Sequence, residues 1–490
     1  MFVVMIAPEC APVAKVGGLG DVVYGLSREL EIRGNAVEII LPKYDCLRVE
    51  HIWGLQPTWH DLRVPWFGGH IPCTVWFGFV DGRKCFFVEP HSPDRYFERG
   101  TFYGCGDDHL RFAFFTRAAL EFMRCSGKRP EIVHSHDWQT ALTAPILFEL
   151  YQHQGMSAQR VCHTVHNFRH QGTAGPEILW ATGLGRPEHF LDRERLGDDW
   201  HPGVVNFTKG AIVFANFITT VSPHHAWEAR FTDQGFGLGP ALARHHDKFG
   251  GILNGLDYEV WNPETDPHLA ARYSVETVER KAENTRALRH RLWLRESAGP
   301  LVAFVGRLDP QKGLHLVKHA LDHSLRQGAQ FVLLGSSPDR AIDEEFRFVK
   351  HVYNDNPDCH LEIGFDEGLA HLIYAAADLV VVPSLYEPCG LPQMIALRYG
   401  AVPIVRRVGG LANTVFDRDW SERPPEERNG WVFEHPDFPG IESAMDRAFA
   451  LWRDDPRAFR AFARQGMRCD YSWRVPGEHY LRVYEHIRHK

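Results

Sequence analysis

The sequence predicts an α/β protein built from two doubly wound domains. Short runs rich in Val, Ile and Phe alternate with longer amphipathic stretches, which is the pattern of βαβ units and therefore of a parallel sheet. The alternation occurs twice along the 490 residues, a length that exceeds one ordinary hydrophobic core. The expected strands are residues 2–6, 37–41, 85–88, 132–134, 160–165 and 217–221 in the first half, and residues 301–305, 331–334, 359–364, 379–382 and 402–405 in the second.

A glycine-rich segment at residues 250–255 predicts the boundary between these domains, and Pro263 and Pro267 follow closely. We therefore expect a first domain at residues 1–250 and a second at residues 251–473. Two such halves that face each other across a hinge form a cleft that can close on a ligand.

The composition excludes several classes of function. A formal charge of −8 and a pI near 6.4, without a long Lys/Arg run, argue against nucleic-acid binding. No apolar run approaches the roughly 18 to 20 residues that a membrane span needs. The ten Cys include no C-x-x-C pair and are interpreted as reduced thiols. The first expected strand begins at Phe2 and leaves no room for a leader segment, so we expect a cytoplasmic protein.

Residue types that ligate metals occur in pairs, but none has a second cluster at the spacing of a zinc site. Asp417 and Asp419 form a D-x-D pattern inside a charged, Pro-rich segment, residues 418–428, which we expect to be an exposed loop. We therefore interpret both acids as surface residues and predict neither a metal nor a cofactor. The histidine pairs are His134 and His136, His224 and His225, and His245 and His246.

A glycine-rich turn after the first strand predicts a phosphate site. Gly17, Gly18 and Gly20 lack a Cβ, so backbone N–H groups can approach an anion closely. The helix expected from about Asp21 directs its positive dipole end at the same spot, and Lys15 adds a full charge. The alternative is a tight strand-to-helix turn without a ligand. The spacing matches neither G-x-G-x-x-G nor G-x-x-x-x-G-K-[ST], so a dinucleotide or P-loop site is not favoured.

The second half supplies matching groups after two of its expected strands. Arg307 and Lys312 place two cations on the turn before a helix expected from Leu314, and Glu387 precedes another glycine-bearing helix start. A carboxylate repels phosphate, so a sugar hydroxyl is the expected partner of Glu387. Singly, these residues are equally well explained as solvated surface charges and a helix N-terminal acid. Together they follow strands of a parallel sheet, where α/β proteins bind ligands.

These segments, and further motifs that follow one another in the order found in the family, resemble the signatures of bacterial glycogen synthases and plant starch synthases, the family 5 glycosyltransferases. The resemblance covers nearly the whole chain. Residues 222–230 and 398–400 resemble the starch synthase III/IV-like branch, which has cyanobacterial members. The motifs that carry the resemblance are residues 15–21 (Lys-Val-Gly-Gly-Leu-Gly-Asp), 136–138 (His-Asp-Trp), 164–167 (Thr-Val-His-Asn), 220–223, 253–257, 261–264, 307–313, 387–391 (Glu-Pro-Cys-Gly-Leu) and 471–473.

The resemblance implies the two-domain fold known as GT-B and a retaining transfer of glucose from ADP-glucose to an α-1,4-glucan, such as glycogen, starch or a maltooligosaccharide. It implies that the N-terminal domain forms the acceptor side and that a final helix at residues 474–490 packs back on it. Residues 251–473 would then bind the nucleotide sugar.

The resemblance also implies a set of site residues. The implied catalytic residues are His166, Arg307, Lys312 and Glu387. The implied donor-binding residues are Lys15, Gly18, Asp137, Asn167, Asn254, Phe365, Cys389, Gly390 and Leu391, and Asp21 is assigned to the acceptor side. Three of these have structural alternatives: His166 as a strand-end histidine, Phe365 as a core residue and Asp21 as a helix cap.

Three departures from the family pattern limit what can be transferred. Pro392 stands where many members have a Thr that contacts phosphate, and Ile395 stands at the second position of an E-x7-E pair. Residues 173–176 replace an aromatic that follows the His-Asn segment in the family. The motifs leave open a related transferase with another nucleotide-sugar donor and a non-catalytic glucan-binding protein. They do not distinguish ADP-glucose from UDP-glucose.

Overall fold

The computed structural model describes residues 1–490 and divides them into two compact units. Unit 1 contains Met1–Gly255 together with Trp473–Lys490, and unit 2 contains Leu256–Ser472. The first boundary therefore falls five residues after the expected end of the first domain at residue 250.

Unit 1 is built on a nine-stranded sheet in the order β11-β10-β7-β6-β1-β2-β5-β4-β3. The strands are parallel except for β3 and β4, which pair antiparallel with each other, and β4 also pairs antiparallel with β5. The order reverses between β1 and β6, so the loops after these two strands lie at the switch point of the sheet. The strands are β1 (Phe2–Ile6), β2 (Ala36–Pro42), β3 (Ile52–Trp66), β4 (Gly69–Val80), β5 (Arg83–Pro90), β6 (Ile132–His136), β7 (Arg160–Val165), β10 (Phe217–Thr220) and β11 (Phe249–Gly251).

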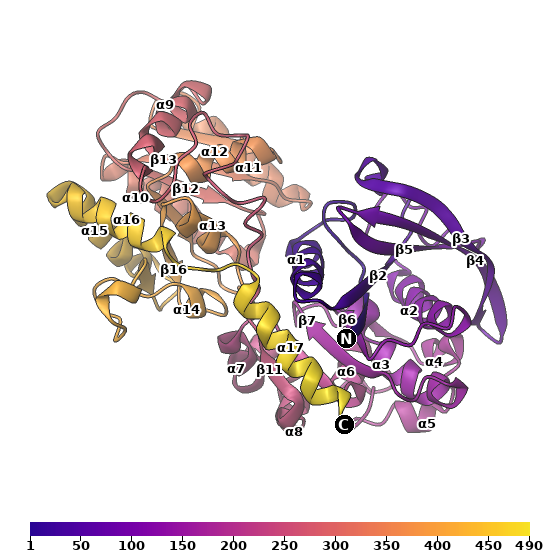
Figure 1. Ribbon diagram of the computed structural model, residues 1–490. Helices are drawn as coiled ribbons and strands as arrows, with labels where there is room; N and C mark the ends of the chain where they lie inside the picture. The colour runs from indigo at the N-terminus through magenta and orange to yellow at the C-terminus, as the bar shows by residue number, and fades with distance from the viewer. The chain divides into compact units, whose positions relative to one another are not determined.

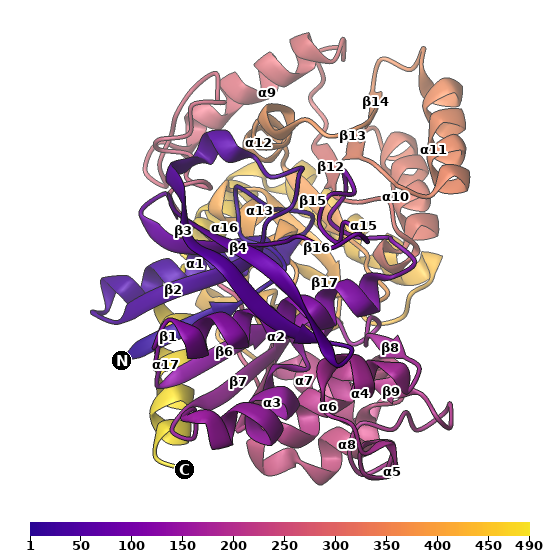
Figure 2. The same ribbon diagram turned by 90° about the vertical axis from the view of Figure 1, so that its right-hand side faces the viewer.

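The β3–β4 ribbon was not expected from the sequence, because prolines and polar residues obscure its alternation. Its edge strand β3 carries Pro57 and Pro65, which an edge tolerates. Two-residue turns with positive φ at both positions close the β3–β4 and β4–β5 connections, at Phe67-Gly68 and Asp81-Gly82. The Asp-Gly dipeptide is the hairpin signal that could have revealed them. Figure 2 shows the long β3–β4 ribbon crossing over α2 (Asp108–Cys125). The β3 strand of this ribbon packs against α2.

The final helix α17 (Arg474–Arg488) belongs to unit 1, where it packs on α1 and β7 (Figure 1). Tyr480 and Tyr484 are fully buried in the core of this unit. A Cβ on Gly25 would lie 2.0 Å from the Trp473 indole nitrogen, so only glycine allows Trp473 to seat on α1. The other helices and short strands of unit 1 are α1 (Gly18–Ile32), α3 (Thr143–Ile146), β8 (Thr173–Ala174), α4 (Glu177–Thr182), α5 (Pro187–Phe190), β9 (Val205–Asn206), α6 (Phe207–Phe214), α7 (Pro223–Phe231) and α8 (Gly239–Arg244).

Unit 2 contains a six-stranded, fully parallel sheet in the order β14-β13-β12-β15-β16-β17. The order reverses between β12 and β15, which places the loops after these strands at the switch point. Its strands are β12 (Leu301–Val305), β13 (Gln330–Gly335), β14 (Cys359–Ile363), β15 (Leu379–Val382), β16 (Val402–Arg406) and β17 (Trp431–Phe433). Its helices are α9 (Lys281–Arg291), α10 (Leu314–Arg326), α11 (Arg340–Tyr353), α12 (Glu367–Ala376), α13 (Pro392–Arg398), α14 (Leu411–Thr414), α15 (Phe438–Asp454) and α16 (Pro456–Met467).

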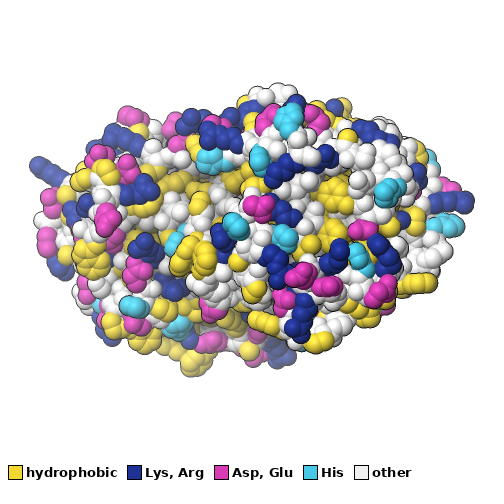
Figure 3. Space-filling view, turned by 90° about the horizontal axis from the view of Figure 1, so that it is seen from below, with side chains coloured by type: hydrophobic (Ala, Val, Ile, Leu, Met, Phe, Trp, Pro, Cys, Tyr) yellow, Lys and Arg dark blue, Asp and Glu magenta, His cyan; other side chains and the backbone are white.

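Both sheets confirm the predicted pair of doubly wound, Rossmann-like domains. Every strand expected from the apolar runs is present, with ends that move by at most two residues. The short strands β8, β9, β11 and β17 were not expected. None of the helices has both the length and the apolar character needed to cross a membrane. On the face shown in Figure 3, acidic and basic side chains are interspersed, and neither sign forms a continuous patch.

Candidate active site

The glycine-rich turn after β1 is organised by an acid that the sequence analysis missed. The Glu9 carboxylate accepts hydrogen bonds from the Val16 N–H at 2.8 Å and the Gly17 N–H at 3.2 Å, and from the Tyr103 hydroxyl at 2.7 Å. Burial raises the pKa of Glu9 despite these bonds. One of the glycine amides expected to face an anion, that of Gly17, is therefore already bonded, which corrects the prediction for this residue. The Gly18 N–H, at the first position of α1, lacks an intrahelical partner because of its place in the helix.

Lys15 and Asp21 form an ion pair with each other, with 2.8 Å between the Lys15 ammonium and the Asp21 carboxylate. Both side chains remain about a third exposed or more, at 41% and 32%. The helix begins at Gly18 and its N-cap is Gly17, so the interpretation of Asp21 as a helix cap is wrong. The structure thus brings together a residue assigned to the donor and one assigned to the acceptor.

Asp137 joins the ends of β6 and β7. One oxygen of its carboxylate accepts the His166 N–H at 2.8 Å and the Asn167 N–H at 3.3 Å, and its own N–H donates to the Thr164 carbonyl at 2.8 Å. Its φ of 59° is rare outside glycine, which indicates backbone strain of the kind found at functional sites. Burial raises the pKa of Asp137 to about 7, although the two amide bonds act in the opposite direction. The second carboxylate oxygen is not used in these bonds.

His166 is a neutral hydrogen-bonding group. Its Nε2 and the Nδ1 of His136 share a hydrogen bond of 3.2 Å, and burial lowers the pKa of His166 to about 3. His136 lies on a stack of buried rings, 4.1 Å from His134, which is hydrogen-bonded to the Tyr484 hydroxyl of α17 at 2.7 Å. A second imidazole thus fixes the ring of His166, which fits the alternative of a satisfied strand-end histidine as well as a role at the sugar.

The side-chain amide oxygens of the two predicted asparagines, Asn167 and Asn254, differ in their hydrogen bonding. The Asn167 side-chain oxygen accepts the Arg169 N–H at 2.9 Å and forms a local turn. The Asn254 side chain is only 6% exposed, and its amide oxygen has no hydrogen-bond partner. Buried polar atoms are rarely left unpaired, so this oxygen is a candidate ligand contact.

In unit 2, Lys312 and Glu387 are partners. Their charged groups lie 2.5 Å apart, both side chains are largely buried, and the Ser384 hydroxyl also donates to the Glu387 carboxylate at 2.9 Å. The sequence analysis assigned these two residues separately to phosphate and to sugar. The fold joins them, because the loop after β12 docks on the loop after β15.

A close backbone approach fixes this docking. Gly313 has a φ of 69°, and a Cβ there would lie 2.2 Å from the Pro383 carbonyl. The Leu385 and Tyr386 amides donate to the Gln311 carbonyl at 2.7 Å and 3.2 Å. Arg307, on the same loop, is exposed and makes no hydrogen bond or ion pair. The switch point therefore combines a buried ion pair with an available guanidinium.

Two further glycines support residues 387–391 and were missed by the sequence analysis. A Cβ on Gly409 would lie 1.9 Å from the Glu387 carbonyl, and one on Gly410 would lie 2.0 Å from the Cys389 carbonyl. The adjacent Gly-Gly after an apolar strand was the available signal. The Gly410 N–H donates to the Glu387 and Pro388 carbonyls, both at 3.1 Å.

The Gln393 amide completes this support by donating to the Cys389 and Gly390 carbonyls, at 3.2 Å and 2.9 Å. Four successive carbonyls of the loop are thus bonded to the protein. The N–H groups of Gly390 and Leu391 make no hydrogen bond and are available to a ligand.

A family described as the starch synthase catalytic domain matches residues 2–244, and one described as glycosyl transferases group 1 matches residues 290–465. Glycogen synthase 1 of Trichormus variabilis is 59% identical over 491 residues, covering 100% of both chains. The chain belongs to the glycogen and starch synthase family. Glycogen synthase of Protochlamydia amoebophila is 44% identical over 500 residues, again covering 100% of both chains.

Solved structures agree with this membership. The catalytic domain of starch synthase IV from Arabidopsis thaliana, bound to ADP and acarbose, superposes with a TM-score of 0.97 at 44% identity and covers 100% of this chain and 99% of that one. Sucrose-phosphate synthase from Thermosynechococcus elongatus, at 19% identity and a TM-score of 0.61 over 99% and 98% of the chains, shares the fold. The predicted family and its starch synthase IV-like character are confirmed, and the chain is a glycosyltransferase.

Phe365 and Ile395 can be placed against the family pattern. Phe365 follows β14 and is 80% exposed, so the alternative of a core phenylalanine is wrong. Ile395 is 5% exposed and packed in the core, so no second carboxylate approaches from this position. Pro392 is the first residue of α13, where its missing N–H costs no intrahelical bond.

The candidate metal ligands have other partners. In the group formed by Cys105, Asp107 and Asp108, both acids pair with arginines, Asp107 with Arg99 at 2.9 Å and Asp108 with Arg111 at 2.7 Å.

Asp417, interpreted above as a surface acid, is 7% exposed. It accepts the Val432 N–H at 2.7 Å and a hydrogen bond from Arg447 at 2.8 Å, so that interpretation is wrong: Asp417 anchors the loop between α14 and β17.

Proposed function

We propose that this glycosyltransferase transfers glucose from ADP-glucose to the non-reducing end of an α-1,4-glucan, with retention of the anomeric configuration. The observation that carries the proposal is the buried Lys312–Glu387 pair beside the unpaired Arg307 at the switch point of unit 2. The starch synthase IV structure with ADP and acarbose supports a nucleotide and a glucan-like ligand in this family.

The leaving diphosphate needs stabilisation as it develops charge. Arg307 and Lys312 supply two cations from one loop, and the free N–H groups of Gly390 and Leu391 supply neutral donors from the next. Glu387 holds Lys312 in place and offers a carboxylate oxygen to a glucose hydroxyl. In unit 1 we assign Lys15 and the Gly18 N–H to phosphate oxygens of the donor, with the Lys15–Asp21 pair opening when the anion binds.

Hydrogen-bonding groups of unit 1 suit the sugar. His166 is uncharged because of its low pKa, so it offers hydrogen bonds and the carbonyl at the end of β7 without adding a charge. Asp137 and Asn167 lie on the same turn and are assigned to glucose hydroxyls. Attack from the face that the diphosphate leaves lets a phosphate oxygen accept the acceptor's proton, so no protein base is needed opposite the sugar. The buried Ile395 is consistent with that route.

The remaining assignments follow from position and exposure. Phe365 offers an open ring face to adenine, and Asn254 offers its unpaired amide oxygen to the bound nucleotide sugar. Residues 251–473 are proposed as the nucleotide-sugar domain and residues 1–250 as the acceptor side, with Asp21 toward the glucan. All ten cysteines are free thiols, which supports a reducing, cytoplasmic location.

The proposal is tested by measuring glucose incorporation from ADP-glucose and UDP-glucose into glycogen and maltooligosaccharides, with and without EDTA. We expect transfer from ADP-glucose without an added metal. Transfer only from UDP-glucose would contradict the assignment of ADP-glucose as the donor. Loss of activity in EDTA that a divalent ion restores would contradict the metal-free route. No transfer from either donor would favour a non-catalytic glucan-binding protein.

The catalytic assignment is tested by Glu387→Gln, which keeps the side-chain shape but removes its charge. We expect kcat/KM for ADP-glucose to fall by about 10² or more. Glu345→Gln, which also breaks a lysine ion pair (with Lys318) but on the surface of unit 2, is the matched control and should keep wild-type kcat/KM. An unchanged kcat/KM with a lowered Tm in Glu387→Gln would make Glu387 a structural residue.

A further inference from the structure

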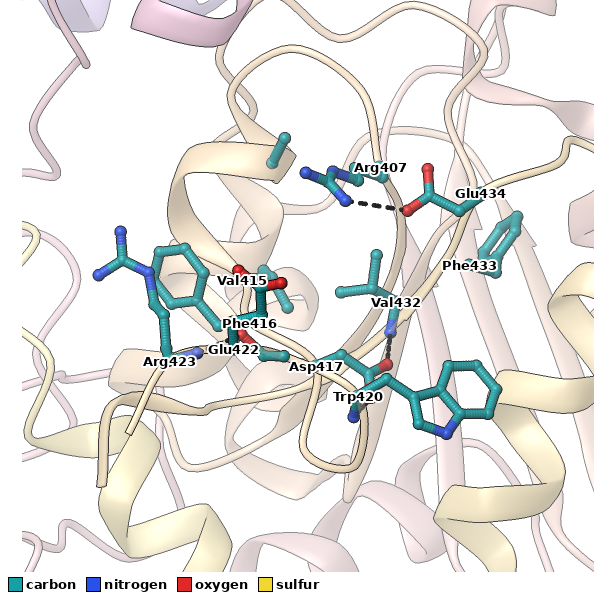
Figure 4. Close-up of a pocket in the computed structure, with 12 residues that line it drawn as sticks. Arg407, Val415, Phe416, Asp417, Trp420, Glu422, Arg423, Val432, Phe433 and Glu434 are labelled. Carbon is teal, nitrogen blue, oxygen red and sulfur yellow. Dashed lines mark hydrogen bonds and ion pairs between the residues drawn. The ribbon is translucent and has the colours of Figure 1, made fainter. Parts of the chain in front are cut away.

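A cavity of about 530 Å³ in unit 2 takes no part in the site described above. It is lined by the carboxyl ends of β16 and β17, by α14 and by the loop that follows α14 (Figure 4). Its size falls within the roughly 300–1,000 Å³ of pockets that bind small ligands. In the sheet, β16 and β17 lie on the far side of β15 from β14, which carries Phe365, so the cavity is not the adenine site.

The acids that line the cavity outnumber its arginines by one. Arg407 pairs with Glu434 at 3.2 Å on one side, and Arg423 pairs with Glu427 at 2.7 Å on another. The lining also includes Glu422, and Asp417 is neutralised by Arg447 at 2.8 Å. A phosphate site needs an excess of free cations, and every arginine here already has an acidic partner. The lining therefore favours a neutral ligand that can accept and donate hydrogen bonds.

Aromatic surfaces stand among these charges. Trp420 is 66% exposed, and the Arg447 guanidinium lies 3.6 Å from the centre of its ring. Arg423 similarly lies 4.0 Å from the centre of the Phe416 ring. Figure 4 shows Trp420 and Asp417 across the cavity from the Arg407–Glu434 pair. Such an arrangement offers a rigid indole to the C–H face of a pyranose and charged partners to its hydroxyls.

The loop that carries Trp420 is held in place. The Asp417 carboxylate accepts the Trp420 N–H at 3.0 Å and the Val432 N–H at 2.7 Å, and the Trp431 indole donates to Asp419 at 3.1 Å. A binding surface held this way loses little conformational entropy when a ligand docks.

We propose that this cavity is a second glucan site, which binds glucose units of the acceptor polymer remote from the end being elongated. The proposal rests on the proposed function, because a weak sugar site gains affinity when the same polymer also occupies the active site and so raises the local concentration of sugar at the cavity. Short acceptors cannot reach both sites and gain nothing from it.

The kinetic test uses Trp420→Ala in the full chain, with Trp293→Ala, an 89% exposed tryptophan elsewhere in unit 2, as the matched control. We expect the KM for glycogen to rise about fivefold in Trp420→Ala, while kcat, the KM for ADP-glucose and the KM for maltotriose stay at wild-type values. Trp293→Ala should match the wild type throughout. An unchanged KM for glycogen, or equal rises for glycogen and maltotriose, would overturn the proposal.

A binding test separates this proposal from the catalytic one. β-Cyclodextrin is an α-1,4-glucan without a non-reducing end, and calorimetry without ADP-glucose measures its binding directly. We expect binding to weaken about fivefold in both Trp420→Ala and Glu434→Gln, the latter changing only a rim charge that is 59% exposed. Binding unaffected by either variant, or saturable binding of inorganic phosphate that Arg407→Ala abolishes, would overturn the glucan assignment. An enzyme that binds cyclodextrin at this site but transfers no glucose would refute the proposed function alone.

Discussion

The candidate groups of unit 1 and unit 2 are held by different forces. In unit 1, apart from the Lys15–Asp21 pair, they are held by hydrogen bonds to uncharged partners: Asp137 to two backbone amides, and His166 to His136. In unit 2 they depend on a buried ion pair, Lys312–Glu387, and on backbone contacts that only glycine permits. Each unit thus presents a different chemistry at the switch point of its sheet.

This difference suggests how the binding of a nucleotide sugar can be divided between two kinds of chemical group. In the proposed reaction the diphosphate carries charge and needs cations, most of which we assign to unit 2, whereas the glucosyl unit carries hydroxyls and needs oriented hydrogen-bonding groups, most of which we assign to unit 1. A buried imidazole with a pKa of about 3 cannot stabilise an anion by its charge near neutral pH. The two units therefore allow separate predictions for variants that remove a charge and for variants that change the conformation of a loop.

The largest effect is expected where charge and burial coincide. Lys312→Ala should lower kcat by about 10² to 10³, because it removes a cation from the leaving group. It should also lower stability by about 3–5 kcal/mol, since Glu387 would remain buried without its partner. Arg307→Ala should lower kcat by about 10² with an unchanged Tm, because that side chain is exposed and unpaired. Equal losses of Tm in the two variants would contradict the distinction between them.

The next effect concerns shape in unit 2. Gly409→Ala should lower kcat by about 30-fold, because its Cβ collides with the Glu387 carbonyl and displaces the loop. Gly328→Ala is the control, since Gly328 has a similarly positive φ of 77° but open space around it. Both variants should lose about 1–2 kcal/mol from backbone strain, measured by denaturant unfolding. Wild-type kcat in Gly409→Ala would remove the glycine pair from the supports of the site.

In unit 1, the pH dependence of kcat/KM should show the ionisation of the Asp137 carboxyl. Its carboxyl is protonated below a pKa of about 7, so kcat/KM should rise with pH through that value if the carboxylate accepts a glucose hydroxyl. Asp137→Asn keeps an oxygen for the His166 N–H, so it should lower kcat/KM about tenfold above pH 7 and abolish this limb. A limb near pH 7 that persists in Asp137→Asn would assign it to another group.

Asp137→Asn should also change how stability depends on pH, and the direction follows from the raised pKa of Asp137. The pKa of Asp137 is higher in the folded state than its ordinary value of 3.8, so the folded state binds the proton more tightly between about pH 4 and pH 7. The contribution of Asp137 to stability is therefore greatest below about pH 4 and falls as the pH rises to about 7. Asp137→Asn should flatten this part of the pH dependence of Tm.

The smallest effect is expected at Lys15, whose ion pair with Asp21 is partly exposed to solvent. Lys15→Ala should raise the KM for ADP-glucose about threefold and leave the Tm unchanged, because exposed ion pairs contribute about 0–1 kcal/mol. A loss of kcat as large as that of Lys312→Ala would show that unit 1 also supplies essential charge, and would erase the contrast between the units.

The sequence by itself determined the parallel strands of both sheets and the loops that follow them. Short apolar runs rich in β-branched residues, such as Leu301–Val305, favour buried strands, and glycine followed by a helical pattern marks a strand-to-helix turn, so both are local signals. The β3–β4 ribbon escaped because prolines and polar residues on an edge strand weaken the alternation that identifies strands.

Only the tertiary structure decided which groups meet. Lys312 and Glu387 are separated by 75 residues, and Asp137 and His166 by 29, and nothing in either local sequence states that they are partners. The burial of Glu9 and Asp417, the exposure of Phe365 and the cavity beside Trp420 likewise depend on what the rest of the chain packs against them. Local sequence sets the conformation of a segment, but burial, pairing and the resulting pKa values are sums over neighbours that the fold alone brings together.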